Sequence, residues 1–191
     1  QDDYVKFIRF GQLLIEKSNC GVLSYITNNG YLDNPTFRGM RQNLMFSFEY
    51  CRVIDLHGNS KKKEVCPDGS PDKNVFDIQQ GVAICVFTKT PNSKNSNVAV
   101  KMTDLYGTRE SKYLRLTQAS LATIPFKKIL PTKPYCLFIE QDQKNRKEYE
   151  EMISLDEVMK TYSVGVVTAR DSLTIAFTKD EIWERVTRFS E

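Results

Sequence analysis

Three short, mainly apolar runs limit what this chain can fold into. They are residues 22–27, 51–56 and 81–88. Such runs are too short for helices, and they lack the strict alternation of a half-exposed strand, so they are typical of strands covered on both faces. Helical patterns separate them, and strands that alternate with helices indicate an α/β layer with a mainly parallel sheet. The sequence therefore predicts an α/β fold.

The segments between these runs have their own signals. Residues 3–18 follow the spacing of an amphipathic helix, and Gly21 is its predicted exit. Asn34 and Pro35 supply a capping side chain and a first-turn proline for a second helix that runs to about residue 49. The polar segment 57–80 is predicted to be a long loop, and loops of that length are usually functional or disordered.

A change in texture at 91–97 predicts a boundary between two domains, 1–96 and 97–191. Beyond it the patterns predict an α+β region. The predicted strands are 98–102, 135–139 and 173–177, and the predicted helices are 111–123, 155–161 and 179–188.

Composition excludes several classes of protein. The net charge of +3 is too small to indicate a nucleic-acid partner by itself. Five scattered cysteines and one histidine, His57, make a zinc site and a disulfide framework improbable and fit a reducing cytoplasm. The sequence contains no run of 18 apolar residues, so no membrane span is expected. We therefore expect a cytoplasmic protein without a metal site.

Several phrases, taken together, resemble a known family. They are GVLSYITNNGYLDNPTFRGMRQNL at 21–44, CRVIDLHGN at 51–59 and NVFDIQQGVAICVFTKT at 74–90. The combination resembles the second half of the catalytic domain of adenine-specific DNA methyltransferases. The resemblance is greatest to the fused, single-chain restriction–modification enzymes called type ISP, and Eco57I-like enzymes are similar. A weaker resemblance continues through LYGTRESKY at 105–113 and GVVTARD at 165–171.

The resemblance implies a fold and a division of the chain. The three apolar runs would be the last three strands of a partial Rossmann-like methyltransferase sheet, with 81–88 antiparallel and inserted between the other two. Residues 97–191 would form an α+β connector to the region that recognises the DNA target. The half of the domain that binds the cofactor would lie outside this chain and would be its partner.

The resemblance also implies which chemistry to expect. The family transfers a methyl group from S-adenosylmethionine to N6 of an adenine flipped out of the duplex. The glycine-containing cofactor motif and the catalytic Asn/Asp-Pro-Pro-aromatic phrase are both missing here, so we expect no catalytic and no cofactor-binding residue and no bound S-adenosylmethionine. A hydrolase built on His57 is not expected either, because the sequence has no G-x-S-x-G phrase.

Phe76 and Asn74 are the candidate substrate-binding residues. In the family an aromatic residue just before the antiparallel strand packs against the flipped adenine, and Asn74-Val75-Phe76 matches that position. The alternative is that Phe76 covers the core where the loop enters the strand. Asn28 and Asn29 follow a strand end, where open α/β sheets bind ligands, although such residues also serve turns.

Basic residues are the candidate contacts to double-stranded DNA. Lys61, Lys62 and Lys63 lie together in the long loop, where they would either contact phosphates or be solvated charges. Arg38 and Arg41, on the second helix, would face DNA or solvent. Arg170 would belong to the DNA-facing connector or pair with Asp171.

The resemblance therefore implies that this chain is a fragment of a DNA adenine-N6 methyltransferase from a restriction–modification system. Two rivals stay open: a DNA-recognition module without catalysis, and an α/β interaction domain without either activity. Salt-dependent DNA binding without methyl transfer would favour the first rival, and neither property would favour the second.

Overall fold

A single five-stranded sheet organises the first part of the chain. The structure is a computed structural model, and it describes residues 2–91, 98–142, 144–163, 165 and 168–190. The contacts divide the chain into two units, Gln1–Gln141 and Asp142–Glu191. The sheet has the order β1-β3-β2-β4-β5. Its strands are β1 (Gly21–Asn28), β2 (Tyr50–His57), β3 (Val82–Lys89), β4 (Ala99–Asp104) and β5 (Lys127–Ile129).

The three predicted strands form one half of this sheet, which confirms the α/β fold. β3 is central and pairs antiparallel with both β1 and β2, so β1 and β2 run in the same direction. In the register Ile26, Ile84 and Ile54 are directly opposite one another. This aligned row on one face, and the row Ala83, Cys85 on the other, explain why the runs are apolar throughout.

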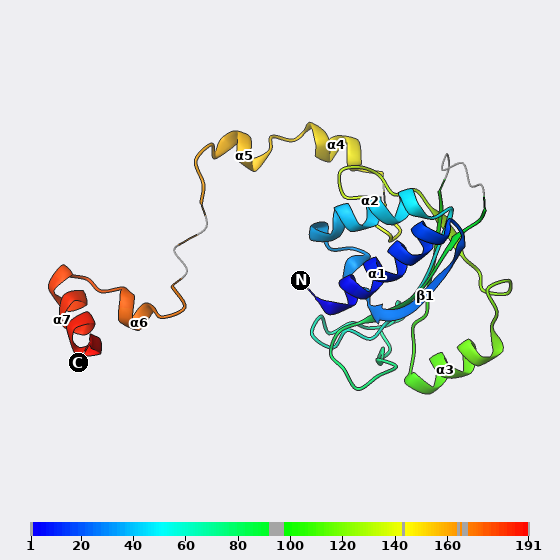
Figure 1. Ribbon diagram of the computed structural model, residues 1–191, viewed down its shortest axis with the longest axis horizontal. Coiled ribbons are helices and arrows are strands. Elements are labelled where there is room, and N and C mark those ends of the chain that lie inside the picture. The colour runs from blue at the N-terminus through cyan, green and yellow to red at the C-terminus, as the bar shows by residue number, and fades with distance from the viewer. Residues whose placement is uncertain (1, 92–97, 143, 164, 166–167, 191) are drawn as a thin grey trace. The chain divides into compact units, whose positions relative to one another are not determined.

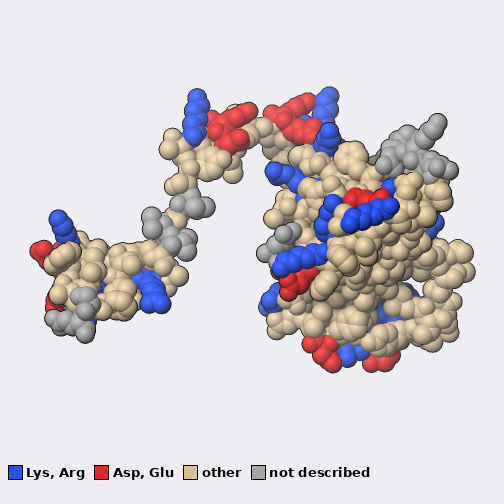
Figure 2. All heavy atoms as spheres, viewed as in Figure 1, with Lys and Arg blue, Asp and Glu red and all other residues tan. Residues whose placement is uncertain are grey.

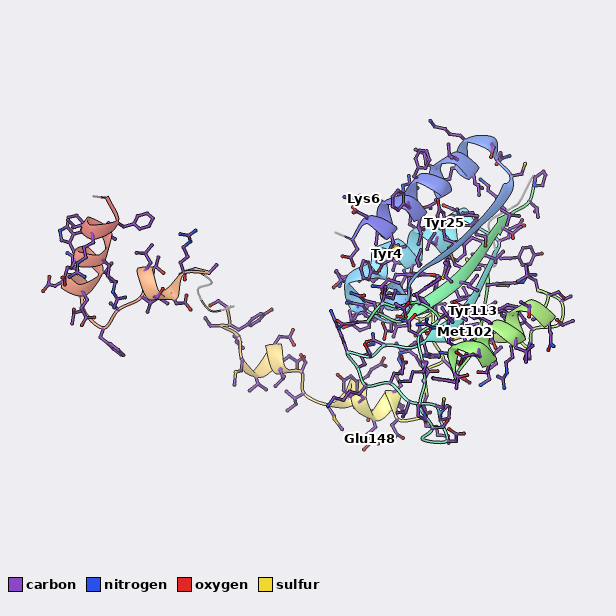
Figure 3. All side chains as sticks on the ribbon, turned by 90° about the horizontal axis from the view of Figure 1, so that it is seen from below. Tyr4, Lys6, Tyr25, Met102, Tyr113 and Glu148 are labelled. Carbon is purple, nitrogen blue, oxygen red and sulfur yellow. The ribbon has the colours of Figure 1, made fainter. Side chains whose placement is uncertain are left out.

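Two helices cover one face of the sheet, and Figure 1 shows them side by side. They are α1 (Asp3–Ser18) and α2 (Arg38–Ser47), and α2 follows a 3₁₀ turn, Pro35–Phe37, that the Asn34 side chain caps as predicted. A Cβ on Gly11 would lie 2.4 Å from the Leu23 side chain, so this glycine lets α1 approach β1 closely. The helix ends through Asn19 in the left-handed conformation, and not through Gly21 as predicted. Tyr4 and Tyr25, labelled in Figure 3, pack against the apolar core between these two helices and the sheet.

The sheet continues beyond the predicted boundary at residue 96. β4, predicted as a half-exposed strand, pairs parallel with β2, and β5 pairs antiparallel with β4. A helix, α3 (Arg109–Gln118), covers the opposite face from α1 and α2, with Leu116 packed against the apolar cluster around Ile54 and Val82. The contacts therefore divide the chain at 141/142. The functional division into catalytic domain and connector stays a prediction, and residues 92–97 of the predicted linker 91–97 lie outside the described residues.

Two predicted strands are wrong. Residues 135–139 are not a strand, because the carbonyl groups of Tyr135 and Cys136 accept hydrogen bonds from the Arg41 side chain, and Cys136 has a φ of 50°. Residues 173–177 overlap a short helix, α6 (Asp171–Thr174).

The second unit contains helices with exposed apolar side chains. They are α4 (Arg146–Glu151), α5 (Leu155–Val158), α6 and α7 (Lys179–Ser190). The predicted helix 179–188 is confirmed, with Thr178 Oγ1 accepting from the Glu181 N–H, while the one predicted at 155–161 is shorter. Among the described residues, no helix is both long and apolar enough to cross a membrane.

Candidate functional site

Polar side chains gather where three strands end at one edge of the sheet. β1, β2 and β4 run in the same direction, so Asn28, His57 and Asp104 lie at their common carboxyl edge. Open α/β sheets bind their ligands outside this edge. The loop 58–81, which leaves β2 and returns into β3, starts and finishes here. This edge and this loop are therefore the candidate functional site.

His57 is the centre of a charged cluster at this edge. Its Nδ1 lies 2.8 Å from Oε1 of Glu64, and its Nε2 lies 2.9 Å from Oδ1 of Asp104. The ring of Tyr106 stacks on the imidazole, with 3.8 Å between the ring centroids. Burial by itself lowers the pKa of His57. The hydrogen bonds to Asp104 and Glu64 and the charge of Asp55 outweigh this effect and raise the pKa from 6.5 to about 10. The ring is therefore charged at neutral pH.

Asp55 connects this cluster to β1. Its Oδ1 accepts hydrogen bonds from Nδ2 of Asn29, at 2.9 Å, and from the backbone N–H of His57, at 3.0 Å. The side chains of Asp55, His57 and Asp104 offer ligand atoms within 4.8 Å of one another, a spacing that a metal ion also accepts. His57 already shares both ring nitrogens with carboxylates, so the geometry is that of an ion-pair network.

Gly58 and Asn74 bring the two ends of the loop together. The Asn74 side-chain amide donates to the carbonyl groups of Gly58, at 3.2 Å, and Gln80, at 2.6 Å. Gly58 has a φ of +83°, and a Cβ on it would lie 2.4 Å from Cα of Asn74. A glycine is therefore required after His57, and the amide group of Asn74 holds the loop closed. Its oxygen accepts the N–H of Phe76 at 2.9 Å.

The side chain of Phe76 lies outside the core. It is 41% exposed, whereas its neighbour Val75 is 2% exposed and packs into the apolar cluster under α3. Val75 therefore fills the place in the core that the alternative interpretation gave to Phe76. The structure leaves the ring of Phe76 accessible near the end of the loop, with residues 77–81 between it and β3.

Lys112 of α3 is a buried cation in the same region that was not predicted from the sequence. Its ammonium donates to the carbonyl groups of Leu56, at 2.6 Å, and Lys73, at 2.7 Å, and lies 2.8 Å from Oδ1 of Asp72. Three donors thus meet three acceptors. Asp72 also accepts the backbone N–H of Gly107. Together these bonds join the middle of the loop to the end of β2 and the start of α3.

Apart from Arg41, the predicted basic residues are exposed on separate segments of the chain. Lys61, Lys62 and Lys63 are exposed on the loop, and Lys62 lies 3.2 Å from Asp33. Arg38 is exposed at the start of α2, and Arg170 is exposed in the second unit. On the face shown in Figure 2, basic and acidic side chains are interspersed, so no single basic face stands out there.

The structure corrects the prediction made for Arg41. It is fully buried and donates to the carbonyl groups of four residues: Tyr31, Asn34, Tyr135 and Cys136. The prediction that Arg41 faces DNA or solvent is therefore wrong. The hydrogen bonds of its guanidinium connect the loop after β1 and the segment 135–136 to α2.

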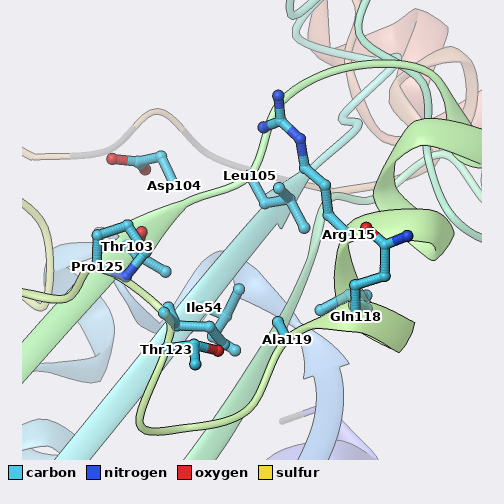
Figure 4. A pocket seen from close by; sticks show the side chains of 11 residues that line it. Ile54, Thr103, Asp104, Leu105, Arg115, Gln118, Ala119, Thr123 and Pro125 are labelled. Carbon is cyan, nitrogen blue, oxygen red and sulfur yellow. The ribbon is translucent and has the colours of Figure 1, made fainter.

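A pocket of about 310 Å³ lies between α3 and the sheet, as Figure 4 shows. Ile54, Leu105, Leu116 and Ile124 make it largely apolar, and Asp104 and Arg115 also line it. The predicted site residues Asn74, Phe76 and Lys61–Lys63 do not line it. The pocket is therefore separate from the loop on which they lie.

Known structures share this fold. At 26% identity, the chain matches the ATP-dependent type ISP restriction–modification enzyme LlaBIII bound to DNA, with a TM-score of 0.71 over 96% of the chain and 13% of that protein. At 25% identity, it matches a nuclease-deletion mutant of the type ISP enzyme LlaGI in complex with a DNA substrate mimic, with a TM-score of 0.68 over 96% of the chain and 18% of that protein.

A third structure matches in fold alone. The DrdV–DNA complex is 21% identical, with a TM-score of 0.70 over 97% of the chain and 19% of that protein. The chain thus spans less than a fifth of each of these proteins. No family model and no curated protein matches it.

Proposed function

We propose that this chain is part of a DNA adenine-N6 methyltransferase of a restriction–modification system. The observation that carries the proposal is the accessible ring of Phe76, held by Asn74 in the last part of the loop that enters the antiparallel strand β3. The sequence resemblance assigns an adenine-stacking aromatic residue to this position. The likeness to two type ISP enzymes bound to DNA supports DNA as the partner.

In this function Phe76 forms one wall of the pocket for the flipped adenine. An aromatic face stacks on an unpaired base without reading its edges, and each such contact is worth about 1–3 kcal/mol by truncation to alanine. Asn74 does not read the base, because its amide group is already bonded to Gly58, Gln80 and the Phe76 N–H. Asn74 instead fixes the place from which Phe76 projects.

The carboxyl edge does not fit S-adenosylmethionine, the cofactor that this function requires. Its polar groups are bonded to one another: Asn28 caps Gly30, Asn29 binds Asp55, and His57 binds Glu64 and Asp104. These side chains are engaged within the chain, so they do not offer the set of free donors and acceptors that a charged amino acid and a ribose require. We propose that residues outside this chain bind the cofactor, and we assign no step of methyl transfer to these side chains.

An uncovered apolar surface supports the rest of the catalytic domain as a partner. β1 is an edge strand, and Val22 and Ile26 on it are 63% and 44% exposed. Edge strands with exposed apolar side chains are usually covered by another element. We propose that the other half of the methyltransferase sheet adds to β1. An Ile26→Glu variant should weaken that association, measured as the affinity between separately produced halves, and an unchanged affinity would exclude this edge.

Phe76→Ala in the intact protein tests the function. Methylation of unmethylated bacteriophage DNA should slow by roughly ten- to a hundredfold, which corresponds to the loss of one stacked base. The melting temperature should change little, because the ring lies outside the core. DNA binding without any methyl transfer by the unmodified protein would favour a recognition module instead. Normal methylation by the folded variant would sink the assignment of Phe76.

A further inference from the structure

One face of α3 holds the backbone of the segment that leads to Phe76. Lys112 and Tyr113 lie three and four positions after Arg109 along the helix, so both are on the side of it that Arg109 occupies. Each donates to a different one of three consecutive carbonyl groups. Lys112 Nζ lies 2.7 Å from Lys73 O, Arg109 Nε lies 3.0 Å from Asn74 O, and Tyr113 Oη lies 2.6 Å from Val75 O.

These bonds replace the partners that a strand would provide. Buried backbone carbonyl groups need donors, and this segment lies in a loop outside the sheet ladder. Arg109 adds a second contact beyond Phe76, because its Nη2 lies 2.6 Å from Oδ1 of Asp77. The segment is therefore bonded to α3 on both sides of Phe76, while the ring itself stays accessible.

We propose that α3 is the template for this segment, and that Tyr113 and Arg109 are positioning residues that set the direction of the Phe76 ring. The proposal rests on the function proposed above for Phe76. A ring that stacks on a flipped base has to be in place before the base arrives, since an aromatic side chain on an unheld loop samples many directions. Neither positioning residue contacts the reacting atoms.

Tyr113→Phe is the sharpest test, because it removes the donor to Val75 and keeps the ring. Tyr113, labelled in Figure 3, lies on α3, and its side chain is partly exposed, so the change leaves the core intact. In the intact protein, hydrogen exchange of the amides of 74–78 should become roughly two- to tenfold faster, as expected for the loss of one hydrogen bond. The kcat for methylation of unmethylated bacteriophage DNA should fall by a similar factor, with the KM for DNA unchanged.

Tyr149→Phe is the matched control, because it removes a hydroxyl from a largely exposed ring in the second unit. It should change neither the exchange of 74–78 nor kcat. Unchanged exchange in Tyr113→Phe would overturn the proposal, and so would faster exchange with a normal kcat. If the unmodified protein transfers no methyl group, the proposed function fails, while the exchange result still decides whether α3 holds the segment.

Discussion

Nε2 of His57 lies 2.9 Å from Oδ1 of Asp104, and this pair joins the ends of two parallel strands. The other ring nitrogen binds Glu64 in the loop. One charged imidazole thus connects β2, β4 and the first part of the loop that carries Phe76. The stability of this edge of the sheet should therefore depend on the protonation of a single group.

The first prediction is a loss of stability at alkaline pH. The pKa of His57 is raised from 6.5 to about 10, so its stabilisation is complete below pH 6.5 and is lost as the pH rises to about 10. A shift of this size corresponds to roughly 3–5 kcal/mol. Urea unfolding of the chain and of His57→Gln should show a difference in unfolding free energy that shrinks over this range. A difference that stays constant would mean that His57 is not charged in the folded chain.

The second prediction concerns the buried pair of Lys112 and Asp72, whose side chains are both 0% exposed. Lys112→Met should cost about 3–5 kcal/mol, because it leaves the charge of Asp72 buried without its partner. Adding Asp72→Asn should recover a large part of that loss, measured by chemical denaturation as a double-mutant cycle. Lys127→Met, which removes an exposed pair with Glu140, is the control and should change stability little. Additive effects of the two buried changes would contradict a direct pairing.

The half of the fold built on local apolar runs was predictable from the sequence. β1, β2 and β3 follow from these runs, and the antiparallel place of β3 came from the family resemblance. β1 differs from the prediction in one respect, because Val22 and Ile26 on one of its faces are exposed. The run 135–139 looks equally apolar, yet it is not a strand. Arg41, which is 94 and 95 positions away in the sequence, donates hydrogen bonds to the carbonyl groups of Tyr135 and Cys136. A local pattern carries no information about such a distant donor.

The candidate site was predictable only in part, for a related reason. Phe76 was found through its place before β3, and its exposure agrees with that hypothesis. His57, Lys112 and Arg41 appear in the sequence as ordinary polar residues, and their burial depends on which elements meet. The signal that was available is the spacing of Arg109, Lys112 and Tyr113, which puts three donors on one helix face.

The third prediction separates a structural arginine from an exposed one. Arg41→Lys should cost roughly 1–3 kcal/mol, because a single ammonium cannot reach all four carbonyl groups that the guanidinium binds. The melting temperature reports this loss. Arg38→Lys, on the exposed first turn of α2, should leave the melting temperature unchanged. An Arg41→Lys variant that melts normally would show that these hydrogen bonds contribute little to stability.

The last prediction decides between the two interpretations of the exposed lysines. If Lys61, Lys62 and Lys63 contact phosphates, each contact releases counterions and contributes about 0.9 to the slope of log K against log salt. Replacing all three by serine should then lower the slope for duplex DNA by up to about 3, and should do so for any sequence, since phosphate contacts carry no base information.

The control is a variant in which Lys61, Lys62 and Lys63 are all replaced by arginine, because it keeps the three charges and should keep the slope. Lys62 also lies 3.2 Å from Asp33, so it has to leave an exposed ion pair to reach a phosphate, and its single replacement should lower the slope least. A serine variant with an unchanged slope would make the three lysines solvated charges. The contact to DNA would then have to come from residues other than this loop.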